Sequence, residues 1–344
     1  MRTILLAVGW MVCCALSVHH EAILLRIPAQ WPALVYDTSQ NRLSEQKIFL
    51  GRVLFYDPLL SRNHQISCAS CHSPYSTFTH VDHALSHGVD DRIGMRNAPV
   101  LLNLAWQKKF MWDGAIHHLD VQALAPLTHH AEMDSHLDSL IFKLSHHPKY
   151  PTLFESVYGS SEISGERILK SLSAFMLTLI SSDSKYDRML RGEVNFSDPE
   201  KKGYHKYKQH CASCHTEPLF TNQSFANNGL PPDVVLQDSG RYKITHQPLD
   251  AFLFRVPTLR NIAWSYPYMH DGRFKRLRDV IKHYREGVAH SATLDPVLQT
   301  PLVLNDSDQV ELIAFLHTLS DSNFIRNPQY HYPKDFFQID SIND

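Results

Sequence analysis

The sequence predicts a mainly α-helical protein built from two similar halves, and three observations support this fold class. Apolar residues recur at helical spacing through much of the chain, whereas the alternation typical of strands is scarce. The motif Cys-Ala-Ser-Cys-His occurs twice, at 68–72 and at 211–215. A longer block of residues is repeated as well, which indicates an internal duplication.

Helical periodicity is found in five segments. These are Leu43–Tyr56, Ser164–Leu190, Pro199–Cys211, Leu277–Tyr284 and Ser307–Leu319. Ser164 is suited to begin the second of them, and Asp306 or Ser307 the last. In the last segment an apolar stripe is expected to lie in the core, formed by Val310, Leu312, Ile313, Leu316 and Leu319.

The composition is that of a folded protein without a preference for nucleic acid. Hydrophobic residues make up 43% of the 344 residues and charged residues 20%. Lys plus Arg (33) nearly balances Asp plus Glu (35), which gives a net charge of −2. Because nucleic-acid-binding proteins usually carry a basic excess, we expect no nucleic-acid partner. The length suggests two domains.

Residues 1–20 predict a secretory signal peptide. Arg2 precedes an apolar run from Ile4 to Val18 that contains no acidic residue. The run is short for a membrane span and typical of a signal sequence, with an uncleaved anchor as the alternative. Cys13 and Cys14 also leave a lipid-anchored form open. We therefore expect a periplasmic protein.

The two Cys-Ala-Ser-Cys-His motifs predict two covalently attached c-type haems. In C-x-x-C-H the two thiols add to the haem vinyl groups, and the histidine binds the iron. A zinc site or a redox dithiol also uses C-x-x-C, but neither needs the adjacent histidine. The first haem would be held by Cys68, Cys71 and His72, and the second by Cys211, Cys214 and His215.

The repeated block places one haem motif in each half. Pro99-x-Leu101-x-Asn103-x-Ala105-Trp106 recurs as Pro257-x-Leu259-x-Asn261-x-Ala263-Trp264, at an offset of 158 residues. Met111-Trp112-Asp113-Gly114 recurs as Met269-His270-Asp271-Gly272 at the same offset. The haem motifs are offset by only 143 residues, so we expect a polar loop inserted around 231–247.

This repeat predicts two cytochrome c-like haem domains. The first is expected at 21–190 and the second at 191–344, with a hinge around 188–197. The tail from Asn323 to Asp344 has no assigned role, and we expect it to wrap the second domain.

With these motifs, the chain resembles the bacterial di-haem cytochrome c peroxidase and MauG family. The similarity extends from about residue 43 to 319. It is carried by stretches such as Leu50-Gly51-x-x-Leu54-Phe55-Tyr56-Asp57, Arg96-Asn97-Ala98-Pro99 and Val256-Pro257-Thr258-Leu259-Arg260-Asn261. The resemblance implies a peroxide site at the first haem, an electron relay at the second, and a calcium ion between them.

The resemblance also assigns catalytic residues to the first half. Glu132 matches the family's acid/base, which moves a proton between the two oxygens of peroxide. Gln122 matches the hydrogen-bonding partner of that acid, and Pro126 lies between the two in sequence. Trp112 matches the tryptophan between the haems, where an indole can pass electrons. The repeat partner of Trp112 is His270.

The resemblance leaves the distal ligand of each haem open. Tyr284 stands where the peroxidases carry methionine and MauG-like members carry tyrosine, while Met269 is a competing ligand of the second iron. A phenolate favours oxidised iron, whereas methionine raises the potential. His87 is either a removable ligand of the first iron or a surface histidine, and its spacing to Asn97 is two residues longer than the family pattern.

The calcium ion implied by the resemblance would bind oxygen ligands, as this hard cation prefers. Asn97 matches the side-chain ligand, and Ser265 and Pro267 match positions that offer backbone carbonyls. The alternative is that Asn97 is an ordinary turn residue.

Three functions follow from these residues. The first is reduction of hydrogen peroxide with electrons from a small cytochrome c or a copper protein. The second is MauG-like oxidation of aromatic side chains in a protein substrate, which Tyr284 favours. The third is a pure electron carrier, against which Glu132 and Gln122 argue, because a carrier needs no proton donor. A homodimer is compatible with each.

Overall fold

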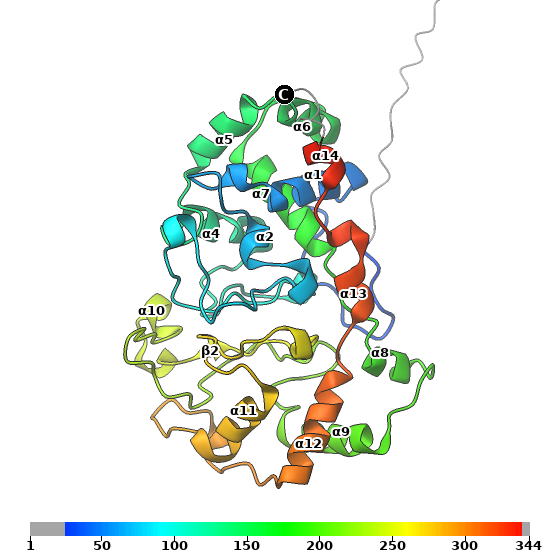
Figure 1. Ribbon diagram of the computed structural model, residues 1–344, viewed down its shortest axis with the longest axis vertical. Helices are drawn as coiled ribbons and strands as arrows, with labels where there is room; N and C mark the ends of the chain where they lie inside the picture. The colour runs from blue at the N-terminus through cyan, green and yellow to red at the C-terminus, as the bar shows by residue number, and fades with distance from the viewer. Residues whose placement is uncertain (1–24, 339–344) are drawn as a thin grey trace, which may run out of the picture.

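The computed structural model describes residues 25–338, which form an upper and a lower half of mainly helical structure (Figure 1). The predicted signal peptide therefore lies outside the described residues. Strand structure is limited, in this part of the chain, to β1 (Phe225–Ala226) and β2 (Phe254–Arg255), which pair antiparallel. The mainly α fold class is thus confirmed. Between residues 25 and 338, no helix has the length and apolar character needed to cross a membrane.

The upper half in Figure 1 has a core built on the crossing of its first and seventh helices. Ser44 begins α1, because its side chain accepts a hydrogen bond from the Lys47 backbone. At Gly51 a Cβ atom would lie 1.9 Å from the carbonyl oxygen of Ser171 on α7, so only glycine permits this approach. The helices are α1 (Glu45–Tyr56), α2 (Cys68–Cys71), α3 (Leu119–Gln122), α4 (Leu124–Thr128), α5 (Leu137–Ser145), α6 (Tyr150–Tyr158) and α7 (Gly165–Leu177).

The lower half repeats this packing with a second pair of helices. At Gly203 on α9 a Cβ atom would again lie 1.9 Å from a carbonyl oxygen, that of Glu311 on α12. Tyr207, Phe220 and Phe315 are fully buried in this second core. The helices here are α8 (Lys185–Leu190), α9 (Asp198–His210), α10 (Tyr242–Thr245), α11 (Leu277–Lys282) and α12 (Asp306–His317).

Backbone features also recur at the offset of the repeated block. Asn103 and Asn261 both adopt left-handed conformations, with φ of 55° and 58°. An isolated β-bridge joins Phe110 to Ile116, and another joins Tyr268 to Phe274, 158 residues later. Such recurrence supports the duplication that the sequence predicts. The division into domains at residue 190 stays a prediction.

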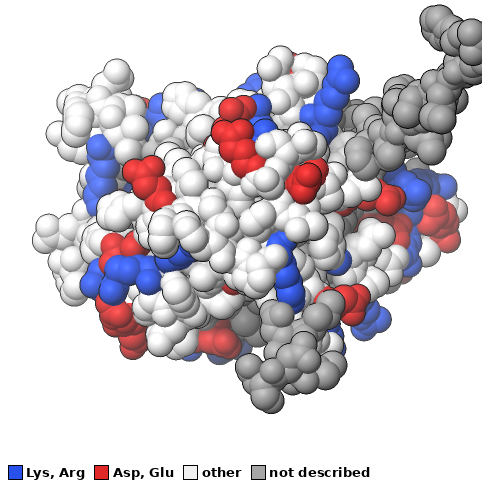
Figure 2. Space-filling view, turned by 90° about the horizontal axis from the view of Figure 1, so that it is seen from above, with Lys and Arg blue, Asp and Glu red and all other residues white. Residues whose placement is uncertain are grey.

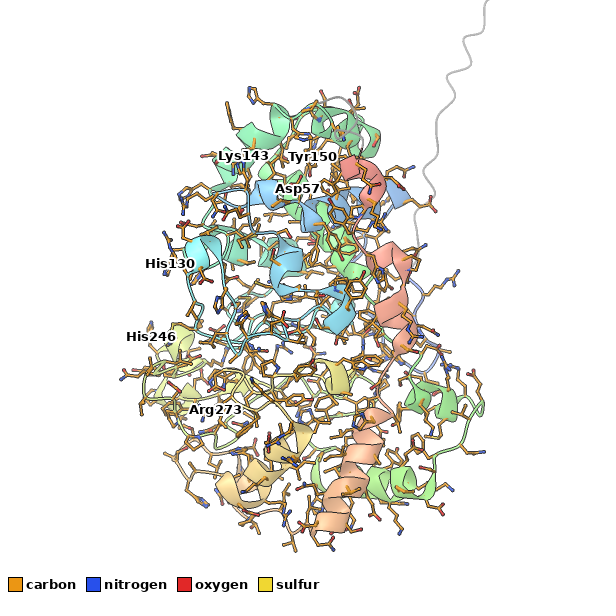
Figure 3. The ribbon with its side chains drawn as sticks, in the orientation of Figure 1. Asp57, His130, Lys143, Tyr150, His246 and Arg273 are labelled. Carbon is orange, nitrogen blue, oxygen red and sulfur yellow. The ribbon has the colours of Figure 1, made fainter. Side chains whose placement is uncertain are left out.

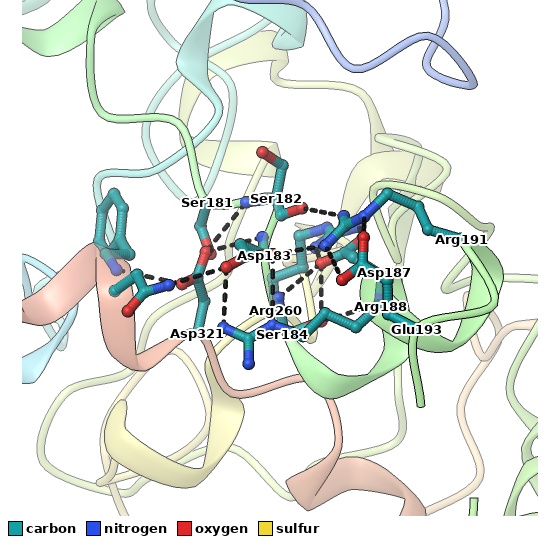
Figure 4. A network of polar contacts seen from close by, with 12 residues as sticks. Ser181, Ser182, Asp183, Ser184, Asp187, Arg188, Arg191, Glu193, Arg260 and Asp321 are labelled. Carbon is teal, nitrogen blue, oxygen red and sulfur yellow. Dashed lines mark hydrogen bonds and ion pairs between the residues drawn. The ribbon is translucent and has the colours of Figure 1, made fainter. Parts of the chain in front are cut away.

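A polar network connects the end of α7 to the C-terminal segment (Figure 4). One carboxylate oxygen of Asp321 accepts hydrogen bonds from the Ser181 hydroxyl and from the backbone of Ser182 and Asp183, each at 3.0 Å. The Ser181 backbone donates to the side chain of Asn103 at 2.9 Å. This segment therefore finds its partners in distant residues rather than in a helix.

The predicted helix Ser164–Leu190 is wrong as a single element for that reason. It divides into α7 and α8, with 178–184 outside both. Ser164 begins α7, as predicted, by accepting from the Arg167 backbone. Ser184 begins α8 through a capping box with Asp187. The polar run before Ser184 satisfies its backbone through Asp321 instead.

Two further expectations about the C-terminal part need correction. Leu312, Leu316 and Leu319 are buried as predicted, but Val310 is 64% exposed because it lies on the outer face of α12. The described tail packs on the first core rather than wrapping the second domain. It contains α13 (Ser322–Arg326) and ends with α14 (Lys334–Phe337), near the top of Figure 1. Tyr330 lies in the first core, and its hydroxyl donates to the Thr178 carbonyl.

Side chains away from the site stabilise this frame. Figure 3 shows Asp57 and Tyr150 together at the top of the molecule, where the tyrosine hydroxyl donates to the carboxylate. Seen from above, acidic and basic side chains are interspersed over this end (Figure 2). The nearly balanced charge of the sequence is thus spread over this face instead of being segregated into one patch.

Candidate functional site

Each haem motif forms one tight turn that brings its thiols and its histidine together. In the first motif the two cysteines are the ends of α2, and the His72 backbone donates to the Cys68 carbonyl at 2.9 Å. In the second motif the His215 backbone donates to the Cys211 carbonyl, also at 2.9 Å. The two motifs therefore share this hydrogen bond between the histidine and the first cysteine.

Both motif histidines are held in the form that binds iron. The Nδ1 atom of His72 lies 2.7 Å from the Phe78 carbonyl oxygen, and that of His215 lies 3.1 Å from the Pro257 carbonyl oxygen. Because a carbonyl only accepts, Nδ1 carries the proton and Nε2 keeps its lone pair. Burial lowers the pKa of each imidazole to about 4, so both are neutral at pH 7.

The motif cysteines fit the same group. All four are free of disulfides. Burial raises the pKa of Cys68 and of Cys211 to about 12, so these thiols are protonated at neutral pH. Free thiols beside a neutral imidazole with an available Nε2 are what haem attachment requires. The residues present therefore fit a c-type haem at each motif.

A cavity of about 260 Å³ adjoins the second motif and contains both predicted distal ligands. Tyr284 and Met269 line it together with His215. Asn228 lies between the two candidates: its amide donates to the Met269 sulfur at 3.5 Å and also hydrogen-bonds to Tyr284. Burial raises the pKa of Tyr284 to about 12. The cavity thus brings both candidate ligands together.

The backbone at Tyr284 departs from the predicted helix. The helix α11 ends at Lys282, and a π-helical turn follows over His283–Gly287. The His283 Nε2 atom lies 3.0 Å from the Asn228 carbonyl oxygen, which holds this turn against the cavity. π-helical turns are frequent at functional sites. Tyr284 also stands 158 residues after Pro126, the offset of the repeated block.

Glu132 lies beside the first motif with an altered acidity. Its carboxyl is close enough to raise the pKa of both Cys68 and Cys71 electrostatically. Burial raises the pKa of Glu132 itself to about 7. Its carbonyl oxygen accepts from the Val89 backbone at 2.8 Å, which fixes the loop that carries it. A carboxyl that titrates near neutral pH therefore faces the first haem motif.

Gln122 ends α3 on the side of the tryptophan segment. Within residues 25–338, its amide contacts the sulfur of Met111, at 3.6 Å, and makes no hydrogen bond to Glu132. The predicted pair is thus not in direct contact. Met111 precedes Trp112, so Gln122 touches the segment between the halves.

Trp112 lies where the two halves meet. Its indole nitrogen donates to the Asn97 carbonyl at 2.8 Å, within the first half. Its own carbonyl accepts from the Arg255 backbone at 2.7 Å, on β2 of the second half. Trp112 also lines the cavity next to the second motif. A position between the two haem motifs is what an electron relay needs.

The predicted calcium ligands line this same cavity. Asn97, Ser265 and Pro267 all contribute to its wall. The Asn97 amide nitrogen donates to the Ala84 carbonyl at 2.9 Å, which leaves the amide oxygen available. In the described part of the chain, no three His, Cys, Asp or Glu residues are grouped to hold a metal. A cation here would be bound by amide and carbonyl oxygens, which suit calcium.

His87 lies on a loop next to the first motif. Its carbonyl oxygen is 3.7 Å from the Cys71 sulfur. Its ring packs 4.4 Å from that of His83, and Nδ1 lies 2.6 Å from an Asp91 carboxylate oxygen. The histidine is therefore near the first haem site but is held by Asp91.

Sequence reasoning missed an ion cluster that joins the halves beside Trp112. Arg96 contacts Asp113 at 2.6 Å and Asp238 at 2.6 Å. Asp238 belongs to the inserted loop of the second half, and Arg96 holds its pKa at about 2. The only signal was the Arg96-Asn97-Ala98-Pro99 block, which gave no hint of its partner. The insertion, expected as a plain polar loop, thus binds the opposite half.

Known proteins resemble this chain over most of its length. The family model of di-haem cytochrome c peroxidase matches residues 45–195. The methylamine utilization protein MauG of Methylophilus methylotrophus is 35% identical, over 81% of this chain and 84% of its own length. The cytochrome c551 peroxidase of Pseudomonas aeruginosa is 30% identical, over 92% of this chain and 89% of its own.

A solved structure extends the similarity to the fold. A MauG-like protein associated with microbial copper homeostasis superimposes with a TM-score of 0.84 at 31% identity, covering 91% of this chain and 99% of the other. The relatives are oxidoreductases, and their family implies two c-type haems and a peroxidase-type activity. The chain therefore belongs to the di-haem cytochrome c peroxidase and MauG family.

Proposed function

We propose that this protein reduces hydrogen peroxide at the first haem site, with electrons relayed from the second. The observation that carries the proposal is the Glu132 carboxyl beside Cys68 and Cys71, with a pKa of about 7. Reduction of peroxide to two waters consumes two electrons and two protons. A bound haem would supply the iron that binds peroxide and passes those electrons to it.

Glu132 is proposed to move the proton in this reaction. As a carboxylate it accepts a proton from one peroxide oxygen, and as an acid it returns that proton to the departing oxygen. A general acid/base works best when its pKa lies near the working pH, because both forms are then populated. The raised pKa of Glu132 meets this condition. Gln122 would keep the Met111 segment in place rather than bind Glu132.

Trp112 is proposed to pass electrons between the two sites. Its hydrogen bond to Asn97 and its contact with Arg255 fix it against both halves. An indole at this position can give up an electron and be reduced again. The donor would deliver electrons near the His215 motif. The name of the Pseudomonas aeruginosa relative favours a small cytochrome c as that donor, with a copper protein as the alternative.

We favour Tyr284 over Met269 as the distal ligand of the second haem. Tyr284 and Pro126 occupy matching places after the repeated block. Pro126 has no ligating atom in its side chain, whereas Tyr284 offers a phenolic oxygen from a π-helical turn that faces the cavity. This contrast supports an open face at the first haem and a ligated second haem. We propose that His87 is not a ligand of the first iron; its contact with Asp91 is made through Nδ1 and concerns only the orientation of the ring.

The proposal also includes a calcium ion, two haem domains, export and a dimer. Asn97, Ser265 and Pro267 would hold one calcium ion in the cavity wall. Residues 21–190 and 191–344 would be the two haem domains, exported to the periplasm after removal of residues 1–20. A homodimer stays part of the proposal.

The second candidate function is MauG-like oxidation of aromatic side chains in a partner protein. Tyr284 is the observation that favours it, since a phenolate ligand stabilises oxidised iron. An electron carrier without chemistry is disfavoured, because it has no use for a carboxyl that titrates near neutral pH beside the first motif.

One experiment separates these functions. One equivalent of hydrogen peroxide is added to the fully oxidised holoprotein, and the haem absorption spectrum is followed. We expect a rapid change in the oxidised protein, because the first haem has an open face; changes at both haems would favour MauG-like chemistry. A change only after one haem is reduced would instead assign His87 as a removable ligand. An unchanged haem spectrum in both redox states would overturn the proposal that the protein is an enzyme.

A further inference from the structure

The cavity beside the second haem motif contains a buried arginine without an anion. Arg255 is 7% exposed and lies on β2, which faces the upper half in Figure 1. Its side chain lines the cavity together with Cys211, Cys214 and His215. Burial lowers the pKa of Arg255 to about 10, so the guanidinium is still charged at neutral pH.

The contacts of this guanidinium are incomplete. Its Nε atom donates to the Met111 carbonyl at 3.3 Å. Across residues 25–338, its two Nη atoms make no hydrogen bond, and no carboxylate forms an ion pair with it. A buried charge without a partner is destabilising, because it has lost its hydration without gaining an ion pair. This cavity-lining guanidinium is therefore able to bind an anion.

Two other arginines show what Arg255 lacks. Arg260 is fully buried, and its two Nη atoms contact both carboxylate oxygens of Asp187 at 2.8 and 2.9 Å. Arg96 has the same kind of fork on Asp238, at 2.6 and 3.0 Å. A guanidinium fork is suited to two parallel hydrogen bonds with a carboxylate. Arg255 lines the cavity and has no such carboxylate partner between residues 25 and 338.

We propose that Arg255 binds a propionate carboxylate of the haem attached to Cys211 and Cys214. A c-type haem would bring two carboxylates to the cavity that these cysteines and Arg255 line together. The ligand class is a carboxylate, and the bonds are charge-assisted. The assignment rests on the haem-attachment motif alone and is independent of the peroxide reaction.

The same residue would connect the second haem to the electron relay. The Arg255 backbone donates to the Trp112 carbonyl at 2.7 Å, and its Nε atom donates to the neighbouring Met111 carbonyl. Arg255 would thus contact the tryptophan segment through its backbone and Nε, and the propionate through its Nη atoms. It is a positioning residue for Trp112 and a binding residue for the haem.

The test uses the holoprotein and three variants. In Arg255→Gln the midpoint potential of the second haem falls, because a positive charge beside it is lost, and the potential of the first haem is unchanged. The two potentials are followed through the separate EPR signals of the haems. In resonance Raman spectra, the propionate bending band of the second haem shifts. In Arg255→Lys the charge is kept, so the potential is retained, while the band shifts because the fork is lost.

Arg241→Gln is the matched control. Arg241 also holds the tryptophan segment, since its Nη1 atom donates to the Asp113 carbonyl at 2.9 Å, but it has Asp250 as a partner and does not line the cavity. Both potentials and the Raman bands stay unchanged in this variant. Unchanged potentials and bands in Arg255→Gln, or a shift confined to the first haem, would overturn the assignment. If Arg255→Gln does not fold, an unshifted propionate band in Arg255→Lys overturns it.

Discussion

The two halves of the molecule differ at the residue that follows the repeated methionine. In the first half this residue is Trp112, whose indole donates to Asn97 and reaches the boundary between the halves. In the second half it is His270, whose ring stacks on Phe254 at a centroid distance of 3.7 Å. The backbone is similar at this point, with left-handed conformations at Met111 and Met269. The two halves thus share local backbone features and differ in the side chain that each presents.

A second difference lies on the helix after the repeated block. The first half has Pro126 there, followed by Glu132 with its raised pKa. The second half has Tyr284 on a π-helical turn. In the proposed function the first half thus supplies the proton-transferring carboxyl, and the second half supplies the distal ligand. The following variants test this difference between the two halves.

The largest effect is expected for Glu132→Gln. Loss of the proton-transferring carboxyl should slow the reaction with hydrogen peroxide by about 10²–10⁴-fold. Stopped-flow absorption measures that rate. Glu155→Gln, at an exposed position of α6, should react like the wild type. Equal rates in Glu132→Gln and the wild type would place the acid/base elsewhere.

Tyr284→Met should change the second haem and leave the first unaffected. Axial ligands set haem potentials over about 0.8 V, and methionine raises the potential, so we expect a rise of roughly 0.2 V at the second haem. A spectroelectrochemical titration follows both haems. Met269→Leu is the comparison, since its potentials should hardly change. The reverse pattern would make Met269 the ligand.

Asp238→Asn should loosen the contact between the halves. Removing one partner of the buried pair with Arg96 should cost about 4 kcal/mol of stability, measured by denaturant unfolding at pH 7. Arg96 lowers the Asp238 pKa to about 2, below its usual value. About 2 kcal/mol of this stability therefore depends on pH: it is present above pH 4 and is lost as the pH falls through about 2.

The variant should lack this acid-dependent loss, because an amide does not titrate. Asp250→Asn serves as a control, since Asp250 is also in the second half but pairs with Arg241 at a longer 3.5 Å. The same unfolding midpoint in Asp238→Asn and the wild type would show that the inserted loop does not hold the halves together.

Gly51→Ala and Gly203→Ala should give the smallest and most nearly equal effects. Each added Cβ would meet a carbonyl oxygen at 1.9 Å in its own helix pair. Forcing apart packed helices should cost about 2 kcal/mol in each case. Thermal unfolding of the two variants measures the costs. Tolerance of alanine at one position only would mean that the two helix pairs do not pack alike.

Local patterns in the sequence were sufficient for part of this structure. The helices α1 and α9 lie where apolar periodicity predicts them, because this signal acts within a few residues. The haem motifs and the repeated block likewise predicted two related sites. The break after α7 could not be predicted, since it depends on Asp321, some 140 residues beyond Ser181.

The unexpected residues of the site share this long-range character. Asn228 contacts Met269 and Tyr284 from a loop without any recognisable pattern. The role of Arg255 can be inferred only from the structure, where its side chain lines the cavity and forms no ion pair within residues 25–338. The position of the tail depends on the hydrogen bond of Tyr330 to Thr178, which no local signal indicates. Contacts between residues far apart in sequence thus determine features that the spacing of residues along the chain does not predict.

The central claim is that the first half performs the peroxide chemistry through Glu132. The most direct test is the pH dependence of the peroxide-induced spectral change in the oxidised holoprotein, measured for the wild type and for Glu132→Gln. The carboxylate must accept a proton, so the wild-type rate should rise through a pKa of about 7 and then level off. In Glu132→Gln the rate should be low and should not rise with pH in this range. A rise through the same pKa in both proteins would show that Glu132 is not the acid/base.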